Sequence, residues 1–92
     1  MALLGNDEIA ARLGELPGWE REGEAIVKSF ERGNFVGSVS FVDSLVEPAE
    51  AMGHHPDVAI SWDTVTVTIS THSEGGLTAA DFELATKIEA LA

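Results

Sequence analysis

The stretch DVAISWDTVTVTIST, residues 57–71, carries the strongest structural signal of this 92-residue chain. Apolar and polar residues alternate on both sides of a short WD connection, and β-branched residues fill the second half, as in two strands joined by a tight turn. Because side chains alternate along a strand, Val65, Val67 and Ile69 would face the core and the threonines between them would face away. The stretch therefore predicts a β-hairpin.

The segment before this hairpin has a helical period. From Asn34 onward, apolar residues recur at steps of four and three, which is typical of one side of a helix. They are Phe35, Val39, Val42, Val46 and Ala49, and Phe41, Leu45 and Met52 widen the same side. We expect this side to face the core. Since Pro48 lacks a backbone N–H, we also expect a kink or break there.

The N-terminal third predicts a short helix followed by a second hairpin. Asn6 can cap a helix that places Ile9, Leu13 and Leu16 on one side and ends at Gly14 and Pro17-Gly18. Residues 19–22 and 25–31 then read as two strands around a turn, with Ile26, Lys28 and Phe30 on one face.

A last helix begins at Thr78, where Thr78-x-x-Asp81 is a variant of the capping box, and its buried side is Phe82, Ala85 and Ile88. The order of elements is then α-β-β-α-β-β-α. The expected fold is α+β, with a four-stranded antiparallel sheet and three helices packed on one face, because this arrangement buries the apolar sides. A chain of this length forms a single domain, residues 1–92.

Composition excludes several classes of function. Sixteen acidic against five basic residues give a net charge of −11, which repels nucleic acids and anionic membrane surfaces. No apolar run approaches the roughly 18 residues of a membrane span, and the N-terminus does not resemble a signal peptide. The absence of cysteine removes disulfides and thiolate metal sites, and it suits a cytoplasmic location.

Three histidines are the candidate chemical groups. His54 and His55 follow the expected central helix, and His72 follows the expected last strand, so they could face one cleft from two sides. Glu50 lies four residues before His54 and would share its helix face if the helix extends that far. Imidazoles titrate near neutral pH, so this trio favours acid–base catalysis without a cofactor.

Two other interpretations stay open from spacing alone. A zinc site made of three histidines is disfavoured, because adjacent histidines rarely converge on one ion and no cysteine assists. Alternatively, His54 and His55 only terminate a helix and His72 is an exposed loop residue.

The pattern around the histidines resembles the pterin-4a-carbinolamine dehydratase family. The matching residues are Glu50, His54-His55-Pro56, Trp62, Thr71-His72, Gly76-Leu77-Thr78 and Asp81. The similarity is close over the C-terminal half and looser in the N-terminal half, where it runs through Trp19, Phe30 and Phe35.

The resemblance implies a dehydratase that removes water from 4a-hydroxytetrahydropterin to give quinonoid dihydropterin, with no metal or cofactor. In such an enzyme His54 and His72 would act as acid and base, and His55 would hold and polarise the substrate. Glu50 would orient His54. The client reaction would be that of an aromatic amino-acid hydroxylase, whose pterin cofactor the enzyme regenerates.

The same resemblance implies a pterin pocket lined by Pro56, Thr71, Ser73 and Glu74. Asp81 belongs to the family signature, but its position also suits a helix cap, which we expect to be its main role with a second contact to the site left open. Trp62, at the hairpin tip, is expected to pack rather than to stack on a pterin.

Partners and competing functions follow from the same comparison. An unpaired edge strand favours self-association, and the resemblance implies a homodimer or homotetramer. One alternative function is non-catalytic binding and dimerisation of a transcription factor. Another is that of a pterin-binding relative in molybdopterin metabolism.

Overall fold

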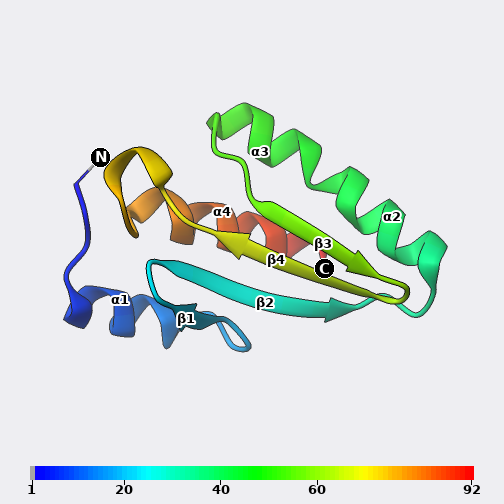
Figure 1. Cartoon of the computed structure of the whole chain (residues 1–92), viewed down its shortest axis with the longest axis horizontal. Coiled ribbons are helices and arrows are strands. Elements are labelled where there is room, and N and C mark those ends of the chain that lie inside the picture. Colours follow the sequence, from blue (N-terminus) through cyan, green and yellow to red (C-terminus); the bar gives the residue numbers. More distant parts are fainter. Residues whose placement is uncertain (1) are drawn as a thin grey trace.

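The computed structural model describes residues 2–92, and its elements follow the expected order (Figure 1). The helices are α1 (Asn6–Leu13), α2 (Phe35–Ser44), α3 (Val46–Met52) and α4 (Ala79–Leu91), with a 3₁₀ turn η1 (His72–Glu74). The strands are β1 (Glu20–Glu22), β2 (Ala25–Glu31), β3 (Asp57–Ser61) and β4 (Thr64–Ile69). Within residues 2–92, no helix has the length and apolarity needed to cross a bilayer.

The four-stranded antiparallel sheet is confirmed, with the strand order β1-β2-β4-β3. The expected hairpin pairs β3 with β4 and sets Val58 opposite Val67. Val65, Val67 and Ile69 are fully buried, as the two-residue period predicts. In contrast, β3 forms one edge of the sheet, and all its residues are exposed. The sheet therefore ends in a strand whose outer side has no partner within the described chain.

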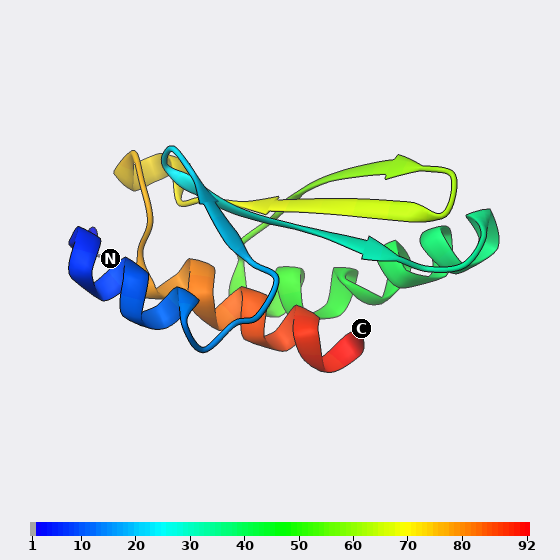
Figure 2. The same ribbon diagram turned by 90° about the horizontal axis from the view of Figure 1, so that it is seen from below.

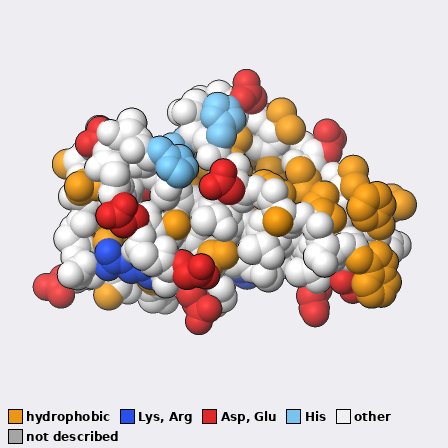
Figure 3. All heavy atoms as spheres, in the orientation of Figure 1, with side chains coloured by type: hydrophobic (Ala, Val, Ile, Leu, Met, Phe, Trp, Pro, Cys, Tyr) orange, Lys and Arg blue, Asp and Glu red, His pale blue; other side chains and the backbone are white. Residues whose placement is uncertain are grey.

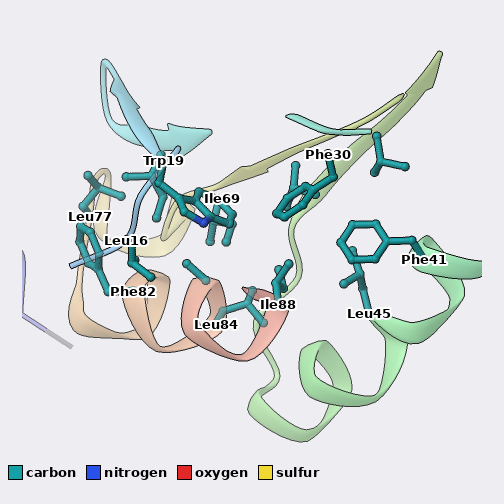
Figure 4. Packing of buried hydrophobic residues seen from close by; sticks show 14 of the residues in the cluster. Leu16, Trp19, Phe30, Phe41, Leu45, Ile69, Leu77, Phe82, Leu84 and Ile88 are labelled. Carbon is teal, nitrogen blue, oxygen red and sulfur yellow. The ribbon is translucent and has the colours of Figure 1, made fainter. Parts of the chain in front are cut away.

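All the α-helices lie in one layer against a single face of the sheet, so the expected α+β architecture is confirmed (Figure 2). The core lies between the two layers, where Trp19 packs edge-on against Phe30, with 6.1 Å between ring centroids, and Phe30 lies 4.9 Å from Phe41 (Figure 4). These aromatic contacts tie the first hairpin to α2. From α4, Leu84 and Ile88 complete the core with no exposed surface.

The central helix is interrupted, as Pro48 led us to expect. α2 ends at Ser44, α3 begins at Val46, and Pro48 occupies the first turn of α3. A proline in a first turn loses no hydrogen bond, because N–H groups there have no partner inside the helix. A continuous helix would require a bond from residue 48 to the Ser44 carbonyl, so the break falls just before Pro48.

The predicted buried side of this helix is confirmed only in part. Phe35, Val39 and Val46 are exposed, whereas Phe41 and Leu45 are buried. Both sides of the helix are apolar, so the periodicity allowed either to face inward. Packing of Phe41 against Phe30 keeps Phe41, Leu45 and Ala49 of the expected side inside and leaves Phe35, Val39 and Val46 at the surface.

Two single-residue expectations also need correction. Asn6 is the first residue of α1 rather than its cap, and its side-chain oxygen accepts a hydrogen bond from Arg21 at 2.8 Å. Trp62 does not pack within the chain: its side chain is 68% exposed, and its backbone adopts a positive φ of 52° in the turn of the second hairpin.

Candidate active site

The two adjacent histidines lie where α3 gives way to β3. α3 ends at Met52, and Gly53 follows in the left-handed conformation with φ 61°. The backbone N–H of His54 then donates back to the Ala49 carbonyl at 3.0 Å, which is the helix-ending arrangement that glycine favours. His54 and His55 therefore lie outside the helix, and the face that we expected Glu50 and His54 to share does not extend to His54.

The pairing of acids with imidazoles differs from the prediction for this reason. Glu50 does not orient His54. Instead, Glu50 Oε2 lies 2.5 Å from Nε2 of His55, while Nε2 of His54 lies 2.6 Å from Oδ1 of Asp81 on α4. The turn at Gly53 moves His54 away from the α3 surface and toward the start of α4. Each adjacent histidine thus has its own carboxylate.

The two pairs lie in very different environments. The side chains of His55 and Glu50 are 62% and 67% exposed, whereas those of His54 and Asp81 are 15% and 0% exposed. An exposed pair is strongly screened by water, so it adds little to stability. The buried pair holds its imidazole in one place, because a buried carboxylate without a partner would be costly.

Asp81 has both of the roles considered from the sequence. Thr78 and Asp81 form a complete capping box at the start of α4, in which Asp81 Oδ2 accepts from the Thr78 backbone N–H at 2.8 Å. The other carboxylate oxygen contacts His54. The helix cap therefore also serves as the anchor of a candidate catalytic group.

Thr71 belongs to the support of the site rather than to its surface. We expected it to line a pocket, but it is buried, and its hydroxyl donates to Asp81 Oδ2 at 2.8 Å. The same hydroxyl lies 2.9 Å from that of Thr78, which the sequence indicated only as a helix cap. Nothing in the spacing of the two threonines predicted this contact, because it depends on how the loop between them folds back.

His72 follows shortly after the end of β4, and the end of β4 pairs with the start of β3, which follows His54 and His55. His72 begins the exposed turn η1, which also holds Ser73 and Glu74. Figure 3 shows imidazole side chains gathered over η1 and the connection from α3 to β3. Because β3 and β4 are antiparallel, the start of β3 lies beside the end of β4, and the two histidine segments are neighbours.

A shallow apolar hollow of about 190 Å³ opens beside His55, between α3 and β3. Glu50, His55 and Pro56 contribute to its wall, and the remaining wall is apolar: Val42, Leu45, Val46, Ala49 and Val58. Sequence reasoning placed Pro56 at a pocket but missed Val46 and Val58, because it expected the stripe through Val46 to be buried.

The site offers three imidazoles with different constraints. His54 is fixed by a buried carboxylate, His55 pairs with an exposed one, and His72 lies on an exposed turn. Within residues 2–92, no group of three or more histidine and acidic side chains is arranged to hold a metal ion. Such a set of imidazoles is suited to donating and accepting protons at a bound substrate.

Comparison with known proteins gives a consistent result over the whole chain. The model of a family described as pterin 4 alpha carbinolamine dehydratase matches residues 2–91. A protein of Roseiflexus castenholzii, named provisionally as such a dehydratase, is 49% identical over 88 residues that cover 96% of this chain and 95% of its own. A similarly named Cyanothece protein is 50% identical over 91 residues, covering 97% and 92% of the two chains.

Solved structures share the fold. A Brucella melitensis protein described as a transcriptional coactivator/pterin dehydratase has a TM-score of 0.94 and 34% identity, with 99% of each chain covered. A pterin dehydratase-like protein described as a RuBisCO assembly factor in the alpha-carboxysome has a TM-score of 0.68 and 26% identity, covering 82% of this chain and 89% of its own.

Proposed function

Since the chain belongs to the pterin-4-alpha-carbinolamine dehydratase family, we propose that it removes water from a 4a-hydroxytetrahydropterin to give quinonoid dihydropterin. The observation that carries this proposal is the pairing of each adjacent histidine with its own carboxylate, next to the end of β4 that leads into the His72 turn. A segment used only to end a helix would not need to direct the His54 imidazole onto the Asp81 carboxylate.

The reaction requires two proton movements and no oxidant. A base removes the proton from N5 of the pterin while an acid protonates the 4a-hydroxyl group. The bond between C4a and oxygen breaks, water leaves, and a double bond forms between C4a and N5. Imidazoles can supply both steps near neutral pH, and general acid–base assistance of this kind contributes about 10²–10⁴-fold in rate.

The histidines are assigned the roles that their surroundings support. His54 and His72 act as the acid–base pair, because one is fixed from within the protein and the other lies on the adjacent exposed turn. His55, paired with Glu50 at the rim of the apolar hollow, holds and polarises the substrate. No metal or cofactor has a role in this scheme.

Contacts to the pterin come from two segments. Pro56 lies at the hollow beside His55, and Ser73 and Glu74 lie with His72 on η1. Thr71 acts through the carboxylate of Asp81, because its hydroxyl is directed inward. The substrate has to come from an enzyme that hydroxylates a tetrahydropterin at C4a, and an aromatic amino-acid hydroxylase fits that requirement.

Single replacement of His54 and His72 by alanine tests the proposal. We expect each variant to lose about 10²–10⁴-fold of the enzymatic dehydration rate, measured spectroscopically with freshly generated 4a-carbinolamine and corrected for its spontaneous dehydration. Glu22→Ala on the distant strand β1 is the matched control and should retain the wild-type rate. Unchanged rates in both histidine variants would refute the enzymatic function.

A non-catalytic role in binding another protein is the second candidate. The exposed apolar residues Phe35, Val36 and Val39 on α2 favour it, because they are 57%, 75% and 44% exposed on a chain that is otherwise strongly acidic. This function would be insensitive to the histidines. A pterin-binding relative with another task in pterin metabolism would instead bind a reduced pterin without turning it over.

We also propose that a second copy of the chain covers this α2 surface. Phe35, Val39, Val42 and Val46 follow steps of four, three and four, the spacing with which paired helices pack. Two chains of charge −11 repel each other, so a contact between them has to form on an uncharged stripe such as this one. The unpaired strand β3 lies next to it, which extends the surface.

A further inference from the structure

One nitrogen of the His54 ring is turned into the protein. Nε2 lies 2.6 Å from Oδ1 of Asp81, and the carboxylate has no exposed surface. Within residues 2–92, Nδ1 of His54 has no hydrogen-bond partner, yet Arg32 Nε is the only fully buried side-chain polar atom without one. Nδ1 is therefore not fully buried, and it is the ring nitrogen that is left free for a substrate.

The second oxygen of the Asp81 carboxylate accepts two hydrogen bonds. Oδ2 accepts from the Thr78 backbone N–H, which can only donate, and from the Thr71 hydroxyl, both at 2.8 Å. The Thr78 hydroxyl oxygen accepts from the backbone N–H of Ala80 at 3.3 Å and lies 2.9 Å from that of Thr71. Because the Thr71 proton points at Asp81, the Thr71 oxygen is available to the Thr78 hydroxyl as an acceptor.

The Asp81 carboxylate therefore accepts hydrogen bonds from these groups and donates none to them. Asp81 lies in the first turn of the 13-residue helix α4, where the positive end of the helix dipole stabilises a negative charge. With two donors on Oδ2 and the helix end beside it, the carboxylate acts as a hydrogen-bond acceptor, so its contact with His54 requires the proton to lie on Nε2. The hydrogen bond of one ring nitrogen determines which form the other takes.

We infer that Asp81, held in place by Thr71 and Thr78, keeps His54 in the tautomer protonated at Nε2, so that Nδ1 is the atom that exchanges a proton with the pterin. This inference rests on the proposed dehydratase function and specifies how His54 performs it. Asp81, Thr71 and Thr78 are positioning residues, because they act on the substrate only through the imidazole.

Asp81→Asn provides a direct test, since an amide has one acceptor and one donor. The two donors that meet at Oδ2 hold the amide oxygen there, and the amide NH₂ group then faces His54. A donor facing Nε2 forces His54 to accept at Nε2 and to carry its proton on Nδ1. The substitution therefore inverts the tautomer while preserving the cap of α4.

Long-range ¹H–¹⁵N correlation spectra of the histidine rings report the tautomer independently of activity. The wild-type chain contains three histidines, and the His54 signals are identified by their loss in His54→Ala. At a pH where the ring is neutral, we expect Nε2 of His54 to carry the proton in the wild type and Nδ1 to carry it in Asp81→Asn. A wild-type ring protonated at Nδ1, or an unchanged tautomer in Asp81→Asn, would overturn the inference.

Turnover provides the second measurement. We expect Asp81→Asn to reduce kcat by about 10²–10⁴-fold, because the base would then be in the wrong tautomer. Thr71→Val should reduce kcat about 10-fold by removing one support of the carboxylate, Thr71→Ser should restore it, and Thr68→Val on β4 should have no effect. Full turnover in Asp81→Asn would contradict the inference and leave the proposed function intact. A wild-type chain with the expected tautomer but no turnover would refute the proposed function instead.

Discussion

At the scale of single residues, the two carboxylates next to the histidines have different tasks. Glu50 is exposed and pairs only with His55, whereas Asp81 is fully buried and satisfies a backbone N–H, a hydroxyl and an imidazole at once. Removing a buried acceptor leaves each of its donors without a partner, which is more costly than losing an exposed pair. The buried His54–Asp81 pair therefore contributes to the stability of the fold, whereas the exposed His55–Glu50 pair contributes little to it.

The free energy of unfolding should separate the two residues. We expect Asp81→Ala to lower it by about 2–4 kcal/mol, because the variant loses a helix cap and leaves buried donors unpaired. Glu50→Ala should change it by less than about 1 kcal/mol. Denaturant titration of both variants followed by circular dichroism measures the difference, and equal destabilisation would contradict the assigned role of Asp81.

At the scale of elements, the junction between α2 and α3 sets the position of the site. Pro48 ends the continuous helix and lies in the first turn of α3. α3 contains Glu50 and leads directly into Gly53 and the two adjacent histidines. In the first turn of a helix the backbone nitrogen needs no hydrogen to donate. The proline ring also fixes φ near the helical value, so Pro48 fits its position in α3 without loss. Its presence also reduces the freedom of the unfolded chain.

Pro48→Ala should therefore be slightly destabilising rather than stabilising. We expect a loss of about 0.4–1 kcal/mol in the free energy of unfolding, with little change in helix content. Chemical denaturation with circular dichroism gives both quantities. A clear gain in stability together with a higher helix signal would indicate that α2 and α3 fuse when the proline is removed, and would contradict this account of the break.

At the scale of the whole molecule, an apolar surface remains on a strongly acidic chain. Figure 3 shows apolar side chains gathered at the end of the molecule where α2 begins and the β3–β4 turn lies. Phe35, Val36 and Val39 contribute to the exposed apolar surface of α2, and Trp62 adds to it from the turn. In water, such a surface is covered most simply by a second copy with the same stripe.

Self-association should thus depend on α2. We expect the wild-type chain to sediment as a dimer or tetramer at low micromolar concentration, and Val39→Lys to shift it toward monomer, because a buried lysine without a partner opposes the contact. Leu91→Lys, at an exposed position on α4, is the matched control and should leave the assembly unchanged. A wild-type chain that sediments as a monomer would contradict the proposal.

Local patterns were sufficient to predict most of the elements. Alternation in residues 57–71 predicted the β3–β4 hairpin, the Thr78-x-x-Asp81 spacing predicted the start of α4, and Pro48 predicted the helix break. Each of these depends on neighbours within a few residues, so the sequence contains the information directly. The three histidines were candidates from the sequence itself, and the resemblance to a known family added the expected reaction and the role of each histidine.

The sequence by itself determined which segments become helices and strands and which side chains are available for chemistry. Only the tertiary structure decided which carboxylate meets which histidine, and which apolar side of α2 faces the core. The left-handed turn at Gly53 directs His54 toward α4, 27 residues further along the chain at Asp81, and no local spacing encodes that distance. Likewise, a helix apolar on two sides is oriented only by the partner it packs against, here Phe30 on β2.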